Sequence, residues 1–451
     1  MTRRKRVWRN WSGSISCSPG QLATPPSVDA VRELVESASR DGRRIRVVGS
    51  GHSFSPLVPT DDVLLSLERL QGIERLDARK GTVTVRAGTT LRSLGRALHA
   101  HGLALENLGG IDAQTVAGAV STGTHGTGTR FGSLSTQVEA MTLVTADGIV
   151  VECSAERDRD LFQAARLSLG ALGVITDLTL RVVAAKRLRL ETRREPFASC
   201  RDRLAQYGQA HEHFELFWFP HTSWVQTRFI NSTDQAQPLS RLRRQVSDLV
   251  LDNALLWALS ECCRLQPSLS AGVSGVCASW APRVRETDWS HRLLVSPRAV
   301  RMEAMEYALP AARAPQALAE IEAALAEHRF PVHVPLGCRF VRADDIWLSP
   351  AYGRDSVYIA AHVYRGMPYE PYFRAVERIL QAHDGRPHWG KRHTADPTHL
   401  ARIYPRWDDF QRIRRSLDPT GLFLNNYLSE LFEAVTPALP TASSAHGRST
   451  T

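Results

Sequence analysis

The feature that most limits the possible folds is a pair of glycine-rich clusters in the first third of the chain. The first cluster, residues 49–53, directly follows an alternating stretch, residues 44–48, that predicts a short strand. The second cluster, residues 109–132, is dense in Gly, Ser and Thr. Such segments offer many backbone N–H groups with no bulky side chain in the way, as a pyrophosphate requires. The apolar residues inside the second cluster favour burial over a surface loop: Val116, Ala117, Ala119 and Val120.

The first cluster reads G-S-G-H-S and has the beginning of the G-x-G-x-x-G fingerprint of dinucleotide-binding units. Phe54 stands where the third glycine is needed, and no helix signal follows, so the NAD fingerprint fails. What remains is a glycine turn that lets the backbone approach a ligand closely, with the imidazole of His52 beside it. In isolation, such a segment is more often a tight turn with a solvated histidine than a ligand-binding turn. The other motifs of the chain are needed to distinguish these two interpretations.

Hydrophobic periodicity predicts an α+β protein. Up to about residue 185, short strands alternate with helices, as in a nucleotide-binding domain. Beyond residue 190, strands of a larger antiparallel sheet are interrupted by a mostly helical insertion that ends near Met302. The predicted helices span residues 27–39, 90–99, 161–169, 315–328, 372–381 and 405–417. The predicted strands span residues 44–48, 63–67, 82–86, 140–145, 149–153, 174–183, 214–219, 225–230 and 356–364.

A chain of 451 residues is long for one core, and the change of pattern predicts a division into domains. We expect a cofactor-binding domain at residues 10–185. A cap or substrate domain, with a large antiparallel sheet flanked by helices, is expected at residues 186–415. Residues 416–435 are expected to return to the first domain. Residues 436–451 are rich in Pro, Ala, Ser and Thr, which predicts a disordered tail.

Charge and cysteine content narrow the functional classes. The chain has 56 Lys and Arg against 46 Asp and Glu, a formal net charge of +10. Nothing resembles a nucleic-acid-binding module, so we interpret the charge as an Arg-rich solvated surface and expect no nucleic-acid partner. The seven cysteines are scattered and form no C-x-x-C pair, which is typical of a reducing cytosol. Residues 8–16 are polar where a signal peptide would be apolar, so we expect a cytoplasmic protein.

The best candidate for a membrane segment is residues 249–259. It contains Asp252 and is too short to span a bilayer. We therefore expect a buried or amphipathic helix at this position, and no membrane span.

Two further motifs fail as metal or nucleotide sites. Residues 385–391 match G-x-x-x-x-G-K, but Arg392 stands where Ser or Thr would bind magnesium, so ATP binding is rejected. His211 and His213 alternate on a predicted strand without further ligands, which favours a half-exposed strand face, and we expect no metal. A polar cluster near residue 390 is expected to face a substrate: His388, Trp389, Lys391 and His393.

Taken together, these pieces resemble the aldonolactone oxidases of the vanillyl-alcohol-oxidase flavoprotein superfamily, which include arabinonolactone, gulonolactone and alditol oxidases. The resemblance covers nearly everything from Asn10 to Leu428. It implies an FAD-binding domain of the PCMH type plus a cap domain. The motifs that carry it are N-W-S-G at 10–13, G-S-G-H-S-F at 49–54, G-T-H-G-T-G at 123–128, D-D-I-W-L-S-P at 344–350, P-H-W-G-K at 387–391 and L-N-N-Y-L at 424–428.

The resemblance implies that His52 bonds covalently to the 8α carbon of the flavin of FAD. It also implies that the two glycine-rich clusters hold the pyrophosphate and lie along the isoalloxazine, while Ile175 lies near the adenosine end. The cofactor-binding residues implied in this way are Gly49, Ser50, Gly51, His52, Ser53, Gly109, Gly118, Ser121, Gly123, Thr124, His125, Gly126 and Ile175.

On the substrate side, the family usually has Glu-x-Arg before the D-D-I-W-L-S-P motif. This chain keeps the arginine as Arg339 but has Gly337 in place of the glutamate. The resemblance implies hydride transfer to flavin N5, with His362 or Lys391 helping to remove the hydroxyl proton and Arg339 stabilising negative charge. Gly109 matches a position where related dehydrogenases carry an alanine that blocks oxygen. We therefore expect reoxidation by O₂ with release of hydrogen peroxide.

The function expected from the sequence is oxidation of a sugar 1,4-lactone similar to D-arabinono-1,4-lactone. A first alternative is a polyol oxidase, or an oxidase of another alcohol, on the same scaffold, which the change at Gly337 favours. A second alternative is a flavin-binding protein without turnover, against which Arg339, His362 and Lys391 argue. A substrate panel read by peroxide release separates the first two.

Overall fold

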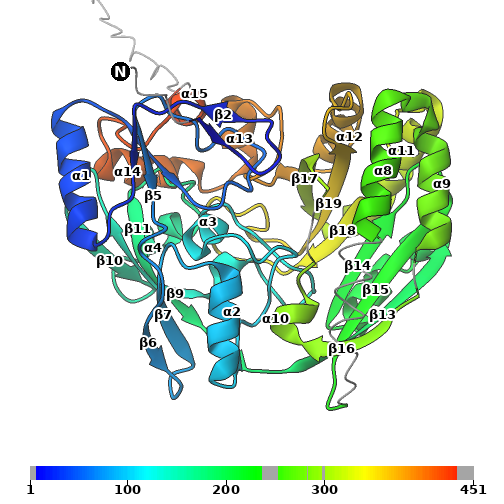
Figure 1. The fold of residues 1–451 in the computed structure, drawn as a ribbon, viewed down its shortest axis with the longest axis horizontal. Coiled ribbons are helices and arrows are strands. Elements are labelled where there is room, and N and C mark those ends of the chain that lie inside the picture. The colour runs from blue at the N-terminus through cyan, green and yellow to red at the C-terminus, as the bar shows by residue number, and fades with distance from the viewer. Residues whose placement is uncertain (1–6, 236–251, 282, 297–299, 434–451) are drawn as a thin grey trace, which may run out of the picture.

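The structure is a computed structural model that describes residues 7–235, 252–281, 283–296 and 300–433. The N-terminal part, coloured blue to cyan in Figure 1, lies on one side of the molecule. An eight-stranded sheet and its helices lie on the other side. The mixed helix-and-sheet architecture and the large antiparallel sheet confirm the predicted α+β fold. The predicted disordered tail at 436–451 lies outside the described residues.

The N-terminal part contains a small parallel sheet and a five-stranded antiparallel sheet. The parallel sheet has the order β3–β5–β4, formed by Gln21–Ala23, Val63–Ser66 and Ile45–Val48. The antiparallel sheet has the order β10–β9–β11–β7–β6, formed by Val150–Ser154, Val138–Val144, Val174–Arg181, Thr82–Arg86 and Ile73–Asp77.

Helix α1 (Val28–Arg40) shows how the sequence sets these elements. The Ser27 hydroxyl caps the helix by accepting a hydrogen bond from the Ala30 amide at 3.1 Å. The periodic residues Val31 and Val35 are buried, which accounts for the helix predicted at 27–39. The helix predicted at 90–99 is likewise present, as α2 (Leu91–Ala100).

The eight-stranded sheet is entirely antiparallel, and its order brings distant parts of the chain together. Helices α9, α11 and α12 pack on one face and bury a core with Leu216, Cys338 and Ile359. The residues that alternate with these point to the opposite face. The strands of the eight-stranded sheet, in spatial order, are β16 (Arg285–Trp289), β13 (Arg187–Pro196), β15 (Trp224–Ser232), β14 (His213–Trp218), β18 (Leu336–Val341), β19 (Ser356–Tyr364), β17 (Met302–Pro310) and β20 (Arg386–Pro387).

The remaining elements are short pairs of strands and helices around these sheets. The two-stranded pairs are β1 (Trp8–Arg9) with β2 (Ser16–Cys17), and β8 (Leu103–Ala104) with β12 (Val183–Ala184). The other helices are α3 (Val116–Ser121), α4 (Arg159–Ala165), α5 (Phe197–Asp202), α6 (Leu204–Ala210), α8 (Asp252–Leu265), α9 (Ser270–Trp280), α10 (Ser290–Leu293), α11 (Ala314–His328), α12 (Glu370–Ala382), α13 (Pro397–Ile403), α14 (Trp407–Leu417) and α15 (Asn426–Glu433).

The C-terminal part of the chain packs against its N-terminal part. Trp347, Trp389 and Phe410 belong to the same hydrophobic core as Val31. The Ile45 amide also donates to the Leu422 carbonyl at 2.7 Å, and helices α13–α15 lie beside the N-terminal strands in Figure 1. Residues 346–348 and 389–432 therefore contribute to the core of the N-terminal part. The predicted domain boundaries at 185/186 and 415/416 stay a prediction.

The sequence prediction differs from the structure at several elements. The helix predicted at 161–169 ends at Ala165, and the positive φ angles of Leu169 and Gly170, 55° and 69°, exclude residue 169 from any α-helix. The sequence prediction lacks eleven of the described strands: β1, β2, β3, β6, β8, β12, β13, β16, β17, β18 and β20. Five of these belong to the eight-stranded sheet, where β17 and β18 are largely buried on both faces and so lose the polar alternation that marks a strand in a sequence. Within the described residues, no helix is both long enough and apolar enough to cross a bilayer.

Candidate active site

A cavity of about 330 Å³ opens beside the carboxyl end of strand β4, where the first glycine-rich cluster begins. It is bordered by α3, by the start of β11 and by the loop after β5. Its size lies in the range of ligand and cofactor sites. Eight of the residues predicted to bind a cofactor line it: Gly49, Ser50, Gly51, His52, Ser53, Gly118, Ser121 and Ile175.

Glycines make this lining possible. A Cβ on Gly49 would lie 2.4 Å from the Thr115 hydroxyl, so only glycine lets the first cluster pack on α3. Thr115 caps α3, and its Oγ1 accepts a hydrogen bond from the Gly118 amide at 3.3 Å. Gly51 has φ +67°, a conformation that L side chains rarely adopt. The loop and the helix therefore meet closely, and their backbones line the cavity.

A second, smaller cavity of about 90 Å³ adjoins the first and shares His52, Ser53, Gln114 and Thr122 with it. Its far side is the face of the eight-stranded sheet that the helices leave uncovered. The strand register aligns Phe217, Gly337, Ala360 and Glu306 in one row across β14, β18, β19 and β17. All four line the cavity, together with the predicted residues Gly109, Thr124, His125, Arg339, His362 and Lys391.

His52 lies where the two cavities join. Its Nδ1 atom is buried and has no hydrogen-bond partner among the described residues, which is rare for a buried polar atom. The imidazole stacks on Trp11 with 5.7 Å between ring centroids. Burial, and secondarily the positive charge of Lys391, lower the pKa of His52. The ring is therefore neutral at pH 7 and presents an uncommitted nitrogen to the cavities.

Arg339 is held by carboxylates on neighbouring strands. Its Nε donates to Glu215 Oε1 at 2.8 Å, and the other oxygen of Glu215 accepts from Arg228 at 2.9 Å. Burial alone would lower the pKa of Arg339, but Glu215 and Glu306 outweigh it and raise that pKa. The guanidinium is thus permanently charged at the wall of the second cavity.

His362 and Lys391 also lie at the second cavity, as the sequence predicted. The His362 Nδ1 lies 3.0 Å from the Pro335 carbonyl oxygen, which can only accept, so Nδ1 is the donor. In the neutral ring the lone pair is then on Nε2. The Lys391 ammonium lies 4.8 Å from the centre of the Phe54 ring.

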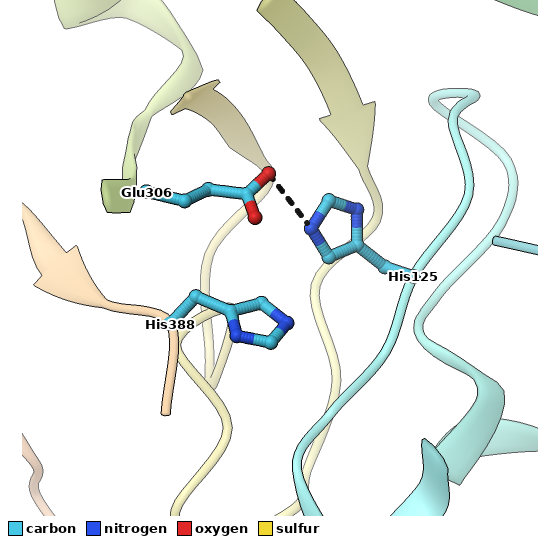
Figure 2. A group of neighbouring side chains, drawn as sticks. All are labelled: His125, Glu306 and His388. Atoms are coloured by element: carbon cyan, nitrogen blue, oxygen red, sulfur yellow. Dashed lines mark ion pairs between the residues drawn. The ribbon is translucent and has the colours of Figure 1, made fainter. Parts of the chain in front are cut away.

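Three buried side chains gather at the junction of β17 with the two loops: His125, Glu306 and His388 (Figure 2). His125 Nε2 lies 3.3 Å from Glu306 Oε1. Burial alone would raise the pKa of Glu306, but its contact with His125, and secondarily the positive charge of Lys391, outweigh burial and hold that pKa well below its usual range. Burial lowers the pKa of His388 to about 3.

The hydrogen bonds assign protons in this group. His125 Nδ1 faces the Gly126 carbonyl at 2.9 Å and must donate, so its contact with Glu306 requires a second proton, shared by Nε2 and the carboxylate. His388 Nδ1 accepts from the Gly390 amide at 3.0 Å, so Nε2 carries the proton of the neutral ring. Although the three ligand atoms lie within 4.8 Å of one another, these tautomers favour a proton-holding group over a metal site.

Glu306 was missed in the sequence, although one signal was available. It is a carboxylate within Met302–Pro310, a strand that is otherwise mostly apolar and buried. A charged residue in such a strand needs a partner, which marks it as a site residue.

The polar cluster predicted near residue 390 is divided. His388 and Lys391 reach the cavity, whereas Trp389 is fully buried and donates to the Leu348 carbonyl at 2.7 Å. The half-buried His393 instead contacts the Tyr427 hydroxyl at 3.0 Å.

Two of the predicted cofactor-binding glycines, Gly123 and Gly126, line neither cavity. A Cβ on Gly126 would lie 2.3 Å from the Leu108 carbonyl oxygen, and one on Gly123 would lie 2.8 Å from Leu167 Cδ1. Their contribution is to let the second cluster fold tightly behind the cavity wall. The His213 predicted to lie on a half-exposed strand face is fully buried, with Nδ1 donating to the Thr127 carbonyl at 2.8 Å.

These residues fit FAD. The larger cavity offers backbone and hydroxyl groups for a dinucleotide, and the smaller one has the sheet face for a substrate. His52, with its unpartnered Nδ1, lines both cavities.

Comparison with known proteins agrees with this site. A model of the D-arabinono-1,4-lactone oxidase family matches residues 178–431, and a model described as an FAD binding domain matches residues 19–154. The L-gulono-1,4-lactone dehydrogenase of Mycobacterium tuberculosis is 38% identical, covering 93% of this chain and 98% of the relative. The L-gulonolactone oxidase of Mus musculus is 35% identical, covering 94% and 98%.

Among solved structures, a solvent-stable cholesterol oxidase superposes with a TM-score of 0.82 at 21% identity, covering 95% of this chain and 97% of that one. That likeness concerns the fold. The family matches confirm the resemblance seen in the sequence motifs. The chain therefore belongs to the D-arabinono-1,4-lactone oxidase family and is an FAD-dependent oxidoreductase acting on CH–OH groups.

Proposed function

We propose that this protein oxidises a sugar 1,4-lactone similar to D-arabinono-1,4-lactone, with FAD attached covalently to His52 and O₂ as the electron acceptor. The observation that carries the proposal is the buried, unpartnered Nδ1 of His52 at the junction of the two cavities. When bound, FAD supplies the hydride acceptor that no side chain provides. The family match to D-arabinono-1,4-lactone oxidases supports the substrate class.

In this proposal, the larger cavity holds the dinucleotide. The backbone of residues 49–53 and the start of α3 surround the pyrophosphate, and Ile175 contacts the adenosine end. Trp11 stacks on His52 and keeps its ring oriented for the covalent bond. The low pKa of His52 keeps the imidazole neutral, as a nitrogen that forms a bond to carbon must be.

His362 is the group placed to take the hydroxyl proton from the substrate. Its Nδ1–H is held by the Pro335 carbonyl, which leaves Nε2 as the acceptor in the neutral ring. Arg339 binds the substrate oxygen on which negative charge develops, and Lys391 adds a second positive charge to the same cavity. The His125–Glu306 pair holds a further proton behind them.

The floor of the second cavity supports a compact ring as substrate. Gly337 and Ala360 leave the sheet backbone nearly bare, and the Phe217 ring lies beside them. A five-membered lactone ring packs its C–H face on such a floor while its hydroxyls meet Arg339 and His362. A polyol oxidase is the second candidate, because Gly337 removes the carboxylate that the family usually has there.

O₂ as acceptor is supported by Gly109, which lines the second cavity without a side chain. A Cβ there would lie 2.9 Å from Thr124 Cγ2, so even a methyl group disturbs this wall. A cytoplasmic location is supported by the cysteines, all seven of which are free in the structure.

The deciding experiment is acid precipitation of the purified protein followed by measurement of flavin in the pellet. Wild type is expected to retain flavin through denaturation, and His52→Ala to release all of it. His101→Ala is the matched control, since His101 is an exposed histidine outside both cavities, and it should behave as wild type. A yellow pellet from His52→Ala contradicts the attachment site.

The substrate is tested separately, by peroxide release from a panel of 1,4-lactones and polyols. A higher kcat/KM for the lactones supports the proposal. A higher kcat/KM for the polyols replaces it with the second candidate. Failure of every lactone and polyol to bleach the flavin under anaerobic conditions excludes both.

A further inference from the structure

The wall of the second cavity contains a single acidic side chain. Of the described residues that line it, Arg339 and Lys391 are cationic and four are histidines, whereas Glu306 alone has a carboxylate. The Glu306 side chain is 6% exposed, and it lines this cavity. An ionised carboxylate accepts stronger hydrogen bonds than a neutral group does, and the hydroxyl groups of a sugar are donors. Glu306 is therefore a candidate to bind a substrate hydroxyl.

Glu306 lies at one end of the cavity floor. The row that the register aligns across the sheet begins at Phe217, continues through Gly337 and Ala360, and ends at Glu306. Gly337 has no side chain and Ala360 has only a methyl group, so neither separates the Phe217 ring from the carboxylate. Three strand spacings, about 14 Å between backbones, leave room for one small ring between these two side chains.

Arg339 and His362 flank this floor on opposite sides. On β19, Tyr358 precedes Ala360 by two residues and His362 follows it by two, so all three point to the same face. Arg339 is registered with Tyr358 and therefore lies on the Tyr358 side of the row. His362 lies on the other side, about 6.7 Å along the strand from Ala360. A ring on this floor meets Arg339 and His362 at its sides and Glu306 at its end.

Neighbouring groups fix the Glu306 carboxylate. His125 Nε2 lies 3.3 Å from Glu306 Oε1, and this ion pair involves only one of the two oxygens (Figure 2). His125 is itself oriented by the Gly126 carbonyl at 2.9 Å and by the Tyr358 ring, whose centre lies 3.9 Å from that of the imidazole. The pKa of Glu306 lies well below its usual range, so the group is ionised at neutral pH. A carboxylate has about four lone-pair sites, so Glu306 keeps acceptor capacity for a ligand.

We propose that Glu306 binds the substrate by accepting a hydrogen bond from a ring hydroxyl other than the one that is oxidised. This inference rests on the proposed function, in which His362 takes the proton of the reacting hydroxyl and Arg339 binds the oxygen on which charge develops. Three contacts around one floor fix the orientation of the ring. The preferred substrates are lactones with a second hydroxyl within reach of Glu306. A lactone without that hydroxyl leaves the buried carboxylate without its hydrogen bond and is a poor substrate.

The test compares wild type with Glu306→Gln on D-arabinono-1,4-lactone and on its monodeoxy analogues, each of which lacks one hydroxyl. The readout is the anaerobic rate of flavin bleaching as a function of lactone concentration, with flavin content measured in parallel. For the parent lactone, Glu306→Gln should lower kcat/KM by about tenfold, mainly through KM. For one monodeoxy analogue, wild type and the variant should agree within about twofold, because neither can form the hydrogen bond.

Two further variants separate substrate binding from a purely structural role. Glu306→Asp keeps the charge beside His125 and shortens the side chain by one methylene, and it should depend on the same monodeoxy analogue. Gly337→Glu in the Glu306→Gln background moves the carboxylate along the row, where a Cβ makes only ordinary contact with the Phe217 ring at 3.7 Å. This double variant should regain about threefold in kcat/KM for the parent lactone without regaining the stability that Glu306→Gln loses.

Glu303→Gln is the matched control on the same strand. Glu303 pairs with Arg392 and does not line the cavity, so kcat/KM should stay within about twofold of wild type for every lactone. The inference is overturned if Glu306→Gln lowers kcat/KM by the same factor for all the lactones, or if its KM for the parent lactone equals that of wild type. A wrong substrate class would instead show in wild type itself, so the two failures can be distinguished.

Discussion

The two cavities of this site are built in opposite ways. The larger cavity is lined by loop backbone, small hydroxyls and glycines from segments close together in the sequence, mostly residues 46–122. The smaller one is walled by side chains from strands β14, β17, β18 and β19, among them Phe217, Glu306, Arg339 and His362, and these strands come from separate segments of the chain. The first construction suits a ligand that is always the same. In the second construction, the substitution of single side chains can change which substrate binds.

The difference between the two cavities predicts which property a variant in each of them should change. Changes in the larger cavity should alter how the flavin is held, and changes on the sheet face should alter turnover while the flavin stays in place. His52 belongs to both cavities and should affect both properties.

The largest effect is expected for Arg339→Ala. Loss of a guanidinium that stabilises developing negative charge typically lowers kcat/KM by about 10² to 10³. Glu215 keeps Arg228 as a partner at 2.9 Å, so the sheet should stay folded. The measurement is the anaerobic rate of flavin bleaching by lactone, with acid-stable flavin content measured in parallel. Arg339→Lys, which keeps the charge but loses the planar guanidinium, should fall between wild type and Arg339→Ala. Loss of flavin in proportion to activity would break the comparison.

The next effect concerns Glu306, the buried carboxylate between His125 and His388. Replacing it with glutamine leaves the shared proton without its anion, and breaking a buried charge pair costs about 3 kcal/mol of unfolding free energy at pH 7. Because the folded pKa lies well below the usual one, the carboxylate stabilises the fold fully above about pH 4.3, where the unfolded group is ionised. That stabilisation is lost as the pH falls through the folded pKa.

Thermal or urea unfolding of wild type and Glu306→Gln, measured from pH 7 down to pH 3, checks this prediction. The difference between them should be constant near neutrality and shrink on acidification. Glu303→Gln is the control on the same strand. Its partner Arg392 is partly exposed, so the loss of unfolding free energy should be smaller. A difference that grows with acidity would refute the assignment of the proton.

These residues also show how far a sequence predicts such a site. The residues that line the larger cavity lie in motifs whose members are neighbours in the sequence. Gly49–Ser53 and Gly118 could therefore be predicted from these motifs alone. Arg339, His362 and Lys391 were found through their motifs. Glu215 and Glu306 could not be placed, because their strands meet only through the sheet order β14–β18–β19–β17, and nothing local in the sequence determines that order.

The folding elements show the same division. Helix α1 was predicted because Ser27 and the valine spacing act within one turn. Strands β17 and β18 were missed because both their faces are largely buried, which removes the alternation of apolar and polar residues. Interactions between neighbouring residues produce recognisable sequence patterns. Contacts between distant strands produce only isolated signals, such as a carboxylate in an apolar strand.

A smaller effect is expected for Gly109→Ala at the shared wall of the site. The new methyl group would lie 2.9 Å from Thr124 Cγ2 and should hinder the approach of oxygen, lowering the rate of reoxidation by O₂ by about tenfold. Reduction by lactone, followed with an artificial dye as acceptor, should change much less. Adding Thr124→Ser removes the clashing Cγ2 atom. If the double variant still reacts slowly with O₂, the methyl group itself is the barrier. A single variant that reacts with O₂ as wild type does would show that Gly109 does not control access.

The smallest effect is expected on the sheet floor, at Gly337. A Cβ there meets nothing closer than the Phe217 ring at 3.7 Å, which is ordinary contact, so Gly337→Ala should change kcat/KM for lactones by less than about threefold. Gly337→Glu instead returns a carboxylate to the row that already holds Glu306, two strands away. Because the missing carboxylate is the difference that favours the polyol candidate, returning it should raise the ratio of lactone to polyol kcat/KM by about threefold to fivefold. Equal ratios for Gly337→Ala and Gly337→Glu would mean that the sheet face does not choose the substrate, and the contrast between a constant flavin cavity and an adjustable substrate cavity would fail at this residue.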